Sequence, residues 1–344
     1  MRRKIFEDKI IVITGAAGTV GNELFRALLR LKPAEIRILD NNESEVFLIG
    51  QEYSSTKNVS TFLGDIRDLP KLEQVFEGAD LVFHLAAFKH VILAEYNPFD
   101  AVQTNVYGVQ NVIQAAIKNR VKKVIFTSSD KAANPTSVMG TTKLMGERLM
   151  TAANVVSFKG NTILSSCRFG NVLGSRGSVV PIFIEQIKAG GPITITDRLM
   201  TRFFMSISEA AGFVLKTAEL AKGGEVFVPK MPVMRIVDLA RALVELLAPR
   251  YGHDPQALEV KYIGAKPGEK MYEELMTQEE ATRAVELEDM FVILPAFSSM
   301  YRHVRYVYPG AKKGKKASAY ISIADNAMAL EDLKRFLLNA IRID

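Results

Sequence analysis

Short apolar runs alternate with longer amphipathic stretches along the first half of the chain. The stretches at residues 22–31, 69–76 and 98–119 have the residue spacing of helices. Apolar runs that predict buried strands occupy residues 9–14, 35–39, 80–85, 121–127 and 162–168, and residues 59–68 are expected to form a strand and a turn. Strands that alternate with helices in this way indicate an α/β fold built on a doubly wound parallel sheet of the Rossmann type.

The pattern becomes less regular after residue 170. Helices are expected at residues 180–189, 207–220, 236–247, 268–275 and 330–341, and strands at 193–196, 225–228 and 259–264. Because the stretch at 207–220 is expected to return to the first domain, that domain should comprise residues 1–170 plus about 206–228. Residues from about 171 to 205 plus 229–344 are then expected to form a smaller, discontinuous C-terminal lobe.

The composition is ordinary for a globular protein and excludes several classes of function. Of 344 residues, 48% are hydrophobic and 24% are charged, and the net charge is +6. The basic run from Lys312 to Lys316 is not part of a basic stripe with aromatic residues, so no nucleic-acid partner is expected. No apolar stretch reaches about 18 residues and the N-terminus is charged, so we expect a cytoplasmic protein without a membrane span. One cysteine and four histidines, which form no cluster, predict neither a disulfide nor a metal site.

Three glycines lie between the first strand and the helix that follows it. Gly15, Gly18 and Gly21 have the spacing GxxGxxG, which permits a tight turn and lets a pyrophosphate approach the backbone at a helix N-terminus. Asp40 ends the second strand about 20 residues downstream, where a carboxylate can accept the ribose hydroxyls of an adenosine. The pattern predicts a dinucleotide site. NAD is favoured because Asp40 repels a 2′-phosphate, while the nearby Arg37 leaves NADP open.

A polar cluster follows the fifth strand. Ser129, Asp130 and Lys131 come directly after an apolar run, at the strand end where open α/β sheets place their chemistry. A helix begins near Met139, and its Lys143 lies one turn further along the same face. The sequence therefore predicts a site at this edge of the sheet, with hydroxyl, carboxylate and ammonium groups.

Together these motifs resemble the extended short-chain dehydrogenase/reductase superfamily, and within it the UDP-N-acetylglucosamine 4,6-dehydratases of polysaccharide biosynthesis. The resemblance extends from Ile10 to about Leu275. Its most specific pieces are residues 129–131, 134–136, 139–143, 168–181, 200–205 and 267–275. It implies a nucleotide-sugar substrate, an NAD cofactor that stays tightly bound and is regenerated in each turnover, and a homo-oligomer.

Met139 departs from the pattern of the superfamily. It occupies the first position of the usual YxxxK pair, which ends here at Lys143, and a thioether cannot take a proton from a sugar hydroxyl. The resemblance favours a subgroup in which Met stands naturally at this position, so that proton removal from the 4-hydroxyl falls to Asp130. An inactive enzyme or a nicotinamide-bound sensor is the alternative.

The resemblance also implies a redox-neutral elimination that gives a 4-keto-6-deoxy sugar. Lys143 is expected to bind the nicotinamide ribose, Ser129 to hydrogen-bond O4, and Asp130 to move protons between O4 and O6. Lys131, with a pKa lowered by burial, is expected to remove the C5 proton. The implied cofactor contacts are Gly15, Gly18, Thr19, Val20, Gly21, Asp40, Asn41, Asp65, Ile66, Leu85, Ala86, Ala87, Lys143 and Arg168. The implied substrate contacts are Lys89, Asn171, Ser178, Thr194, Thr201, Arg202 and Glu269, with Asn171 and Arg202 at the pyrophosphate.

Two other functions are compatible with these motifs. A nucleotide-sugar 4-epimerase uses the same cofactor and the same oxidation at C4, but it requires neither a base at C5 nor an acid at C6. A non-catalytic NAD-binding regulator is the alternative from a different class. UDP is implied by resemblance only, so GDP stays open, as does retention or inversion at C5.

Overall fold

The computed structural model describes residues 2–156, 162–265, 268–301, 304–312 and 317–340, and confirms the expected parallel sheet. Most of the basic run at 312–316 and residue 341 lie outside this part of the chain. Among the described residues the large sheet has nine strands in the order β14-β15-β10-β6-β5-β4-β1-β2-β3. These strands are β1 (Ile10–Thr14), β2 (Glu35–Asp40), β3 (Val59–Leu63), β4 (Leu81–His84), β5 (Lys123–Ser129), β6 (Ile163–Phe169), β10 (Val226–Pro229), β14 (Ala284–Glu286) and β15 (Met290–Ile293).

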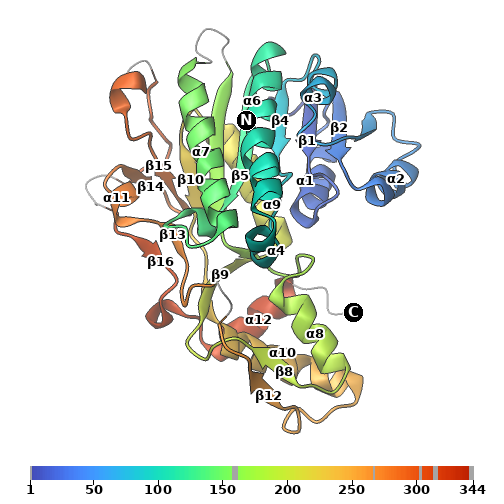
Figure 1. Ribbon diagram of the computed structural model, residues 1–344, viewed down its shortest axis with the longest axis vertical. Helices are drawn as coiled ribbons and strands as arrows, with labels where there is room; N and C mark the ends of the chain where they lie inside the picture. The colour runs from blue at the N-terminus through green and yellow to red at the C-terminus, as the bar shows by residue number, and fades with distance from the viewer. Residues whose placement is uncertain (1, 157–161, 266–267, 302–303, 313–316, 341–344) are drawn as a thin grey trace.

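Helices cover both faces of the large sheet (Figure 1). Successive residues of β1 point to opposite faces, so Ile11 and Ile13 join one apolar cluster and Val12 joins another. The first cluster includes α1 (Thr19–Leu29) and α9 (Ile207–Leu220), and the second includes α3 (Leu69–Val75), α6 (Gly108–Lys118) and α7 (Val138–Val156). The strands are therefore buried on both sides, which explains their nearly continuous apolar sequences.

A smaller lobe lies below the large sheet in the view of Figure 1. Its core contains side chains such as Phe183, Leu243 and Leu337. The helices of the lobe are α8 (Val179–Lys188), α10 (Ile236–Leu247) and α12 (Leu330–Ala340). Its strands form small sheets, in which β8 (Ile193–Ile195) pairs with β12 (Val260–Tyr262) and β9 (Thr201–Met205) lies between β7 (Asn171–Val172) and β11 (Val233–Arg235).

Two expectations for the C-terminal half need correction. Residues 268–275 do not form a helix; they contain a turn and β13 (Glu274–Met276), which pairs with β16 (Tyr320–Ile321). In addition, β14 and β15 join the large sheet through antiparallel pairing of β15 with β10. Part of the stretch at 229–344 therefore packs with the first domain. The short helix α11 (Gln278–Ala281) comes directly before β14 in the chain.

The expected helix at 98–119 is interrupted. It consists of α5 (Pro98–Val102), a π-helical turn (Gln103–Tyr107) and α6. The turn contains the buried Asn105, whose amide donates to the carbonyl of Phe88 and to Thr142 Oγ1 and accepts from the Phe88 N–H. These bonds hold the loop after β4 against α7, which fixes one wall of the site described next. The short helix α4 (Val91–Tyr96) lies at the same edge of the sheet, and α2 (Glu43–Glu52) begins there after Asn42.

Candidate active site

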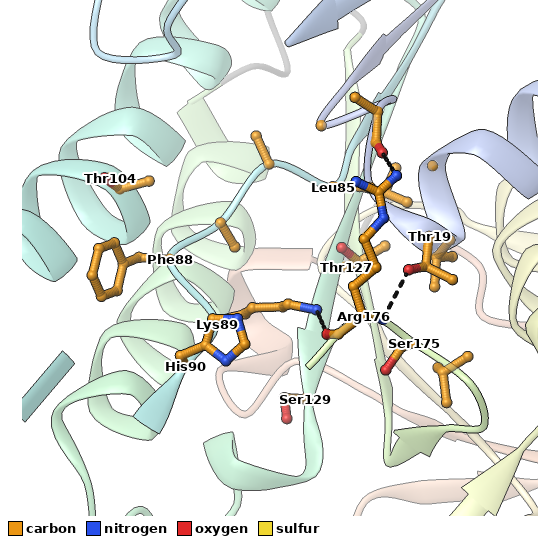
Figure 2. Close-up of a pocket in the computed structure, with 18 of the residues that line it drawn as sticks. Thr19, Leu85, Phe88, Lys89, His90, Thr104, Thr127, Ser129, Ser175 and Arg176 are labelled. Carbon is orange, nitrogen blue, oxygen red and sulfur yellow. Dashed lines mark hydrogen bonds between the residues drawn. The ribbon is translucent and has the colours of Figure 1, made fainter. Parts of the chain in front are cut away.

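A cavity of about 710 Å³ opens at the carboxyl ends of β1, β2, β4 and β5 (Figure 2). This is the edge at which doubly wound sheets bind ligands, and the volume suits a small-molecule cofactor with its substrate. The wall combines the glycine turn after β1, the loop after β4, the start of α7 and the loop after β6. Of the expected cofactor contacts, those that line it are Gly15, Gly18, Thr19, Val20, Gly21, Asp40, Asn41, Asp65, Ile66, Leu85, Ala86, Ala87 and Lys143.

The glycine turn fits a dinucleotide for a steric reason. Gly15 has φ +72°, and a Cβ there would lie 2.4 Å from the backbone nitrogen of Ala86, while a Cβ at Gly21 would lie 2.3 Å from the Gly15 carbonyl oxygen. Only glycine permits strand, turn and helix to approach so closely. The N-terminus of α1 faces the cavity. Its N-cap residue, Gly18, has no side chain to accept from the first backbone N–H groups of the helix, which leaves them for a pyrophosphate.

Asp40 lies where an adenosine ribose is expected. Its carboxylate accepts hydrogen bonds of 3.0 Å from the backbone N–H groups of Ala17 and Asn42, which fix it at the rim of the cavity. Arg37 points elsewhere, because its guanidinium donates to Glu35 and to the carbonyls of Val75 and Glu77. The arginine that left NADP open therefore does not face this position.

Arg168 does not line the cavity. Arg168 belongs to β6, and its side chain is fully buried. The guanidinium forms ion pairs of 2.6 Å with Glu147 and 2.9 Å with Glu280 and donates to the carbonyl of Leu275. These partners occupy its donors, so the expected cofactor contact is corrected to a structural role that joins α7 and α11.

Lys143 reaches the cavity from the second turn of α7. Its ammonium donates to the Thr127 carbonyl at 2.8 Å and lies 4.5 Å from the centre of the Phe126 ring. Burial lowers the pKa of Lys143 from its ordinary 10.5 to about 8. The lowered pKa that was expected for Lys131 is therefore found at Lys143 instead.

Ser129, Asp130 and Lys131 meet at the floor of the cavity. The Ser129 hydroxyl donates to Asp130 Oδ1 at 2.7 Å, and the Lys131 ammonium lies 3.0 Å from the same oxygen. Ser129 and Lys131 line the cavity, whereas Asp130 is 1% exposed and lies behind them. Gly140 allows this arrangement, since a Cβ there would lie 2.3 Å from the Lys131 carbonyl oxygen and would push α7 away from the turn.

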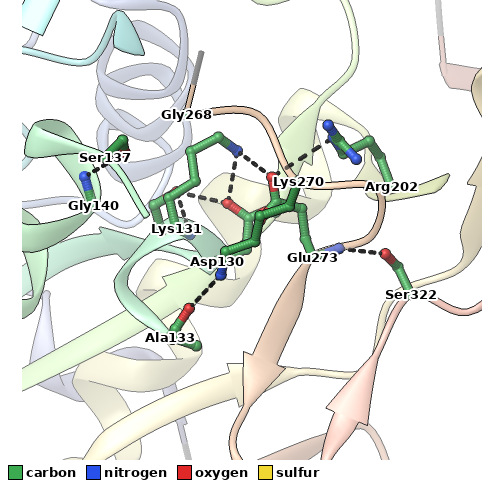
Figure 3. A network of polar contacts seen from close by, with 12 residues as sticks. Asp130, Lys131, Ala133, Ser137, Gly140, Arg202, Gly268, Lys270, Glu273 and Ser322 are labelled. Atoms are coloured by element: carbon green, nitrogen blue, oxygen red, sulfur yellow. Dashed lines mark hydrogen bonds and ion pairs between the residues drawn. The ribbon is translucent and has the colours of Figure 1, made fainter. Parts of the chain in front are cut away.

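Glu273 is a member of this cluster that the sequence did not reveal (Figure 3). Its Oε1 lies 3.4 Å from the Lys131 ammonium and 3.7 Å from Arg202 Nε. Burial alone would lower the pKa of Lys131, but the charges of Asp130 and Glu273 outweigh it and raise that pKa. Lys131 is thus held as an ammonium, contrary to expectation. Its partner Glu273 comes from the segment mistaken for a helix. The resemblance includes residues 267–275, but it assigned no role to Glu273 and did not indicate that the carboxylate faces Lys131.

Met139 lines the cavity as an apolar side chain. It is 4% exposed and packs against Ala94 and Ala101. The position that usually carries a phenol in the resembled superfamily is therefore filled by a packed thioether, which cannot carry a proton.

The expected substrate contacts divide into two groups. Lys89, Asn171 and Ser178 line the cavity. Arg202 does not, because the residue is 6% exposed and its guanidinium donates to the carbonyls of Thr201 and Met271 beside Glu273. Three other expected contacts do not line the cavity either. Thr194 is hydrogen-bonded to Gln186, the Thr201 hydroxyl donates to the Ser322 carbonyl, and Glu269 is exposed.

Arg176 is a second residue that the sequence did not reveal. It extends from the loop after β7 across the cavity to the glycine turn (Figure 2), and its guanidinium reaches Glu45 on α2. Its guanidinium pairs with Glu45 at 2.7 Å and donates to the Ala17 carbonyl at 3.1 Å, and Lys89 donates to its carbonyl at 2.9 Å. The loop therefore bridges the cavity between its two walls.

Two expected absences can be examined in the part of the chain that the structure describes. There, no cluster of three or more His, Cys, Asp or Glu side chains is suited to hold a metal ion. Within the same residues, every helix is too short or too polar to cross a membrane.

Comparison with known proteins gives the family of the chain. A family model described as polysaccharide biosynthesis protein matches residues 11–295. A UDP-N-acetylglucosamine 4,6-dehydratase (inverting) from Campylobacter jejuni is 40% identical over 294 residues, which are 85% of this chain and 84% of that protein. A UDP-glucose 4-epimerase from Rickettsia massiliae is 37% identical over 338 residues, which are 97% of this chain and 96% of that protein.

The fold is also found among solved structures. The X-ray structure of Pen from Bacillus thuringiensis has a TM-score of 0.89 to this chain at 43% identity, and the match covers 97% of this chain and 98% of that one. Other solved structures of this fold hold NAD.

Proposed function

Since the chain belongs to the polysaccharide biosynthesis protein family, we propose that it is an NAD-dependent nucleotide-sugar 4,6-dehydratase. The proposed substrate is UDP-N-acetylglucosamine or a related nucleoside-diphosphate hexose, and the product is its 4-keto-6-deoxy derivative. The observation that carries this proposal is the cluster of Ser129, Asp130 and Lys131 at the floor of the cavity that also contains Lys143. The cluster supplies an acid and a base beyond what oxidation at C4 requires.

The cavity suits NAD as a tightly held cofactor. The glycine turn leaves room for a pyrophosphate, and Asp40 offers its carboxylate to ribose hydroxyls while repelling a 2′-phosphate. A dinucleotide bound here would supply the redox chemistry of the reaction, which is hydride transfer between C4 and C6 without net consumption of a reductant.

The residues of the chain then account for the protons. The O4 proton passes through the Ser129 hydroxyl to Asp130, which is why Asp130 need not touch the sugar. Lys131 removes the C5 proton and later returns a proton to C5. Asp130 returns this proton through the Ser129 hydroxyl to the hydroxyl that leaves C6, so the substrate loses one water in total. The positive charge of Lys143 favours the alkoxide that develops at O4.

Met139 fits this division of labour. We propose that the chain belongs to a subgroup in which methionine is native at the tyrosine position, because Met139 is packed and the Ser129–Asp130 contact offers another route for the O4 proton. An inactive NAD-binding regulator would have no use for that contact.

The substrate is proposed to lie over the same floor. Lys89, Asn171 and Ser178 are the candidates for direct contact with the substrate. The Ser178 hydroxyl is buried and has no hydrogen-bond partner among the described residues, so it is available to a ligand. Arg202 is assigned to Glu273 rather than to the pyrophosphate.

A 4-epimerase is the second candidate. It is favoured by the Rickettsia massiliae relative, whose match spans more of this chain than that of the Campylobacter jejuni dehydratase. Epimerisation at C4 requires no base at C5, however, and leaves Lys131 without a role.

The two candidates give products of different mass. Incubation with UDP-N-acetylglucosamine should give a product lighter by one water, detected by mass spectrometry, with GDP-N-acetylglucosamine as a parallel substrate. A product of unchanged mass that coelutes with UDP-N-acetylgalactosamine would establish the epimerase. Tight NAD binding without any new sugar would establish the regulator.

A further inference from the structure

Lys131 is paired in a way that conflicts with its proposed role as a base. Its ammonium lies 3.0 Å from Asp130 and 3.4 Å from Glu273, and its side chain is 26% exposed. An amine that carries a proton cannot accept another from C5. The site therefore needs a group that takes the proton of Lys131 before the sugar is deprotonated.

Glu273 is placed to be that group. Its side chain is 3% exposed, and its Oε1 faces both Lys131 and Arg202. Its Oε2 is buried and has no hydrogen-bond partner among the described residues, as is true of Asp130 Oδ2, but Asp130 is already engaged by the Ser129 hydroxyl in the transfer of the O4 proton. An ionised carboxylate normally has partners for both oxygens, whereas a carboxylic acid is less costly to bury in this way.

The backbone holds Glu273 firmly in this position. The Glu273 N–H donates to Ser322 Oγ at 2.9 Å, and the Ser322 N–H donates to the Glu273 carbonyl at 2.9 Å (Figure 3). Ser322 follows directly after β16, so the pairing of β13 with β16 aims the carboxylate at Lys131.

We propose that Glu273 is the positioning residue that accepts the proton of Lys131 and so makes its amine available as the base at C5. The step converts the ammonium and carboxylate into an amine and a carboxylic acid without change in total charge. Lys131 then takes the C5 proton and later returns a proton to C5, after which Glu273 restores the proton of Lys131. This inference rests on the proposed dehydratase function.

The charged groups around Glu273 set its proton affinity. Burial raises the pKa of Glu273 and the Asp130 carboxylate adds to the effect, while Lys131, Arg202 and Lys270 oppose it. A carboxyl group with a raised pKa holds a proton from a lysine more readily than an ordinary glutamate does.

The test compares Glu273→Gln with the parent in deuterium oxide, with UDP-N-acetylglucosamine as substrate and NMR of deuterium at C5 as the readout. The amide keeps the size of the side chain but cannot take a proton. We expect C5 exchange to fall about a hundredfold or more, which lies within the range of general acid–base effects. The parent rate should rise with pH above 4.5 as Glu273 ionises, and the variant should lack this rise.

Matched variants separate this role from a structural one. Glu273→Asp keeps the carboxylate and should restore part of the rate together with its rise with pH. Glu274→Gln changes the neighbouring glutamate, which accepts from Asn134 instead, and should behave as the parent does. Thermal unfolding of each variant reports whether the fold is intact.

Three results would overturn the inference. One is C5 exchange in Glu273→Gln at the parental rate. Another is a rate of Glu273→Gln that still rises with pH but does so at lower pH than in the parent, since Glu273 would then act only as a fixed negative charge beside Lys131. The third is failure of Glu273→Asp to recover any rate while it folds normally. If the parent itself shows no product and no exchange, the proposed dehydratase function fails instead.

Discussion

Replacing Lys143 with methionine is expected to stabilise the cofactor-free protein at neutral pH while it removes a charge that the chemistry needs. The ammonium is 6% exposed at the carboxyl end of the large sheet. Burial lowers its pKa from 10.5 to about 8, so the folded state disfavours the proton that the unfolded chain retains up to higher pH.

The expected change in the free energy of unfolding follows from the difference between the pKa values of Lys143 in the unfolded and the folded protein. Each pKa unit corresponds to about 1.4 kcal/mol, so the folded protein disfavours the charged lysine by about 3 kcal/mol below pH 8. Methionine has a similar length and lacks this cost, but it loses the hydrogen bond to the Thr127 carbonyl, worth about 1 kcal/mol. Lys143→Met should therefore be more stable than the parent by about 2 kcal/mol at pH 7.

The sign of the pH dependence gives the sharper test. Between about pH 8 and pH 10.5 the unfolded parent holds a proton that the folded parent has lost, so the parent gains stability as the pH rises. The advantage of the variant should shrink over this range and reverse near its upper end. Urea unfolding of both proteins at several pH values, without cofactor, measures the difference.

A control on the exposed face of α6 isolates the effect of the cavity. Lys118→Met removes an amine that pairs with Glu73 outside the cavity, and reports what the substitution itself does. If the difference in stability between Lys143→Met and the parent does not change with pH, the pKa of Lys143 is not lowered by burial in the folded protein.

Three further predictions follow from the contacts around the cavity. Arg176→Ala should release NAD about fivefold faster, because it removes the exposed ion pair with Glu45, which is worth up to about 1 kcal/mol. Stopped-flow displacement measures the release rate, and Arg241→Ala, which removes an exposed ion pair on α10, is the control. Met139→Tyr should cost about 1–3 kcal/mol in urea unfolding through overpacking against Ala94 and should not raise turnover, so a large gain in turnover would contradict the role given to Asp130. Lys131→Met should abolish C5 exchange measured by NMR, and exchange at the parental rate would exclude Lys131 as the base.

The fold was predictable where the sequence carries its own periodicity. The helices at 207–220 and 236–247 begin and end where their apolar spacing indicated. The pairing of β14 and β15 with β10 was not predictable, because strands of three and four residues carry too short a pattern and tertiary contacts decide where they pair.

The site was predictable where its residues are neighbours in sequence. The glycine turn, Asp40 and the cluster at Ser129 lie at the carboxyl ends of strands, and the parallel sheet brings these strand ends together. Contacts between distant segments gave no such signal, so Glu273 was missed. Arg168 was misassigned for the same reason, because its partners Glu147 and Glu280 lie on α7 and α11.

The most direct test of the dehydratase proposal is NMR of the product formed from UDP-N-acetylglucosamine in deuterium oxide. We predict a 4-keto-6-deoxy sugar that carries a solvent deuteron at C5, because Lys131 exchanges its proton with water before it returns one to C5. The coupling constants of the product also report retention or inversion at C5. UDP-N-acetylgalactosamine without deuterium at C5 would contradict the account.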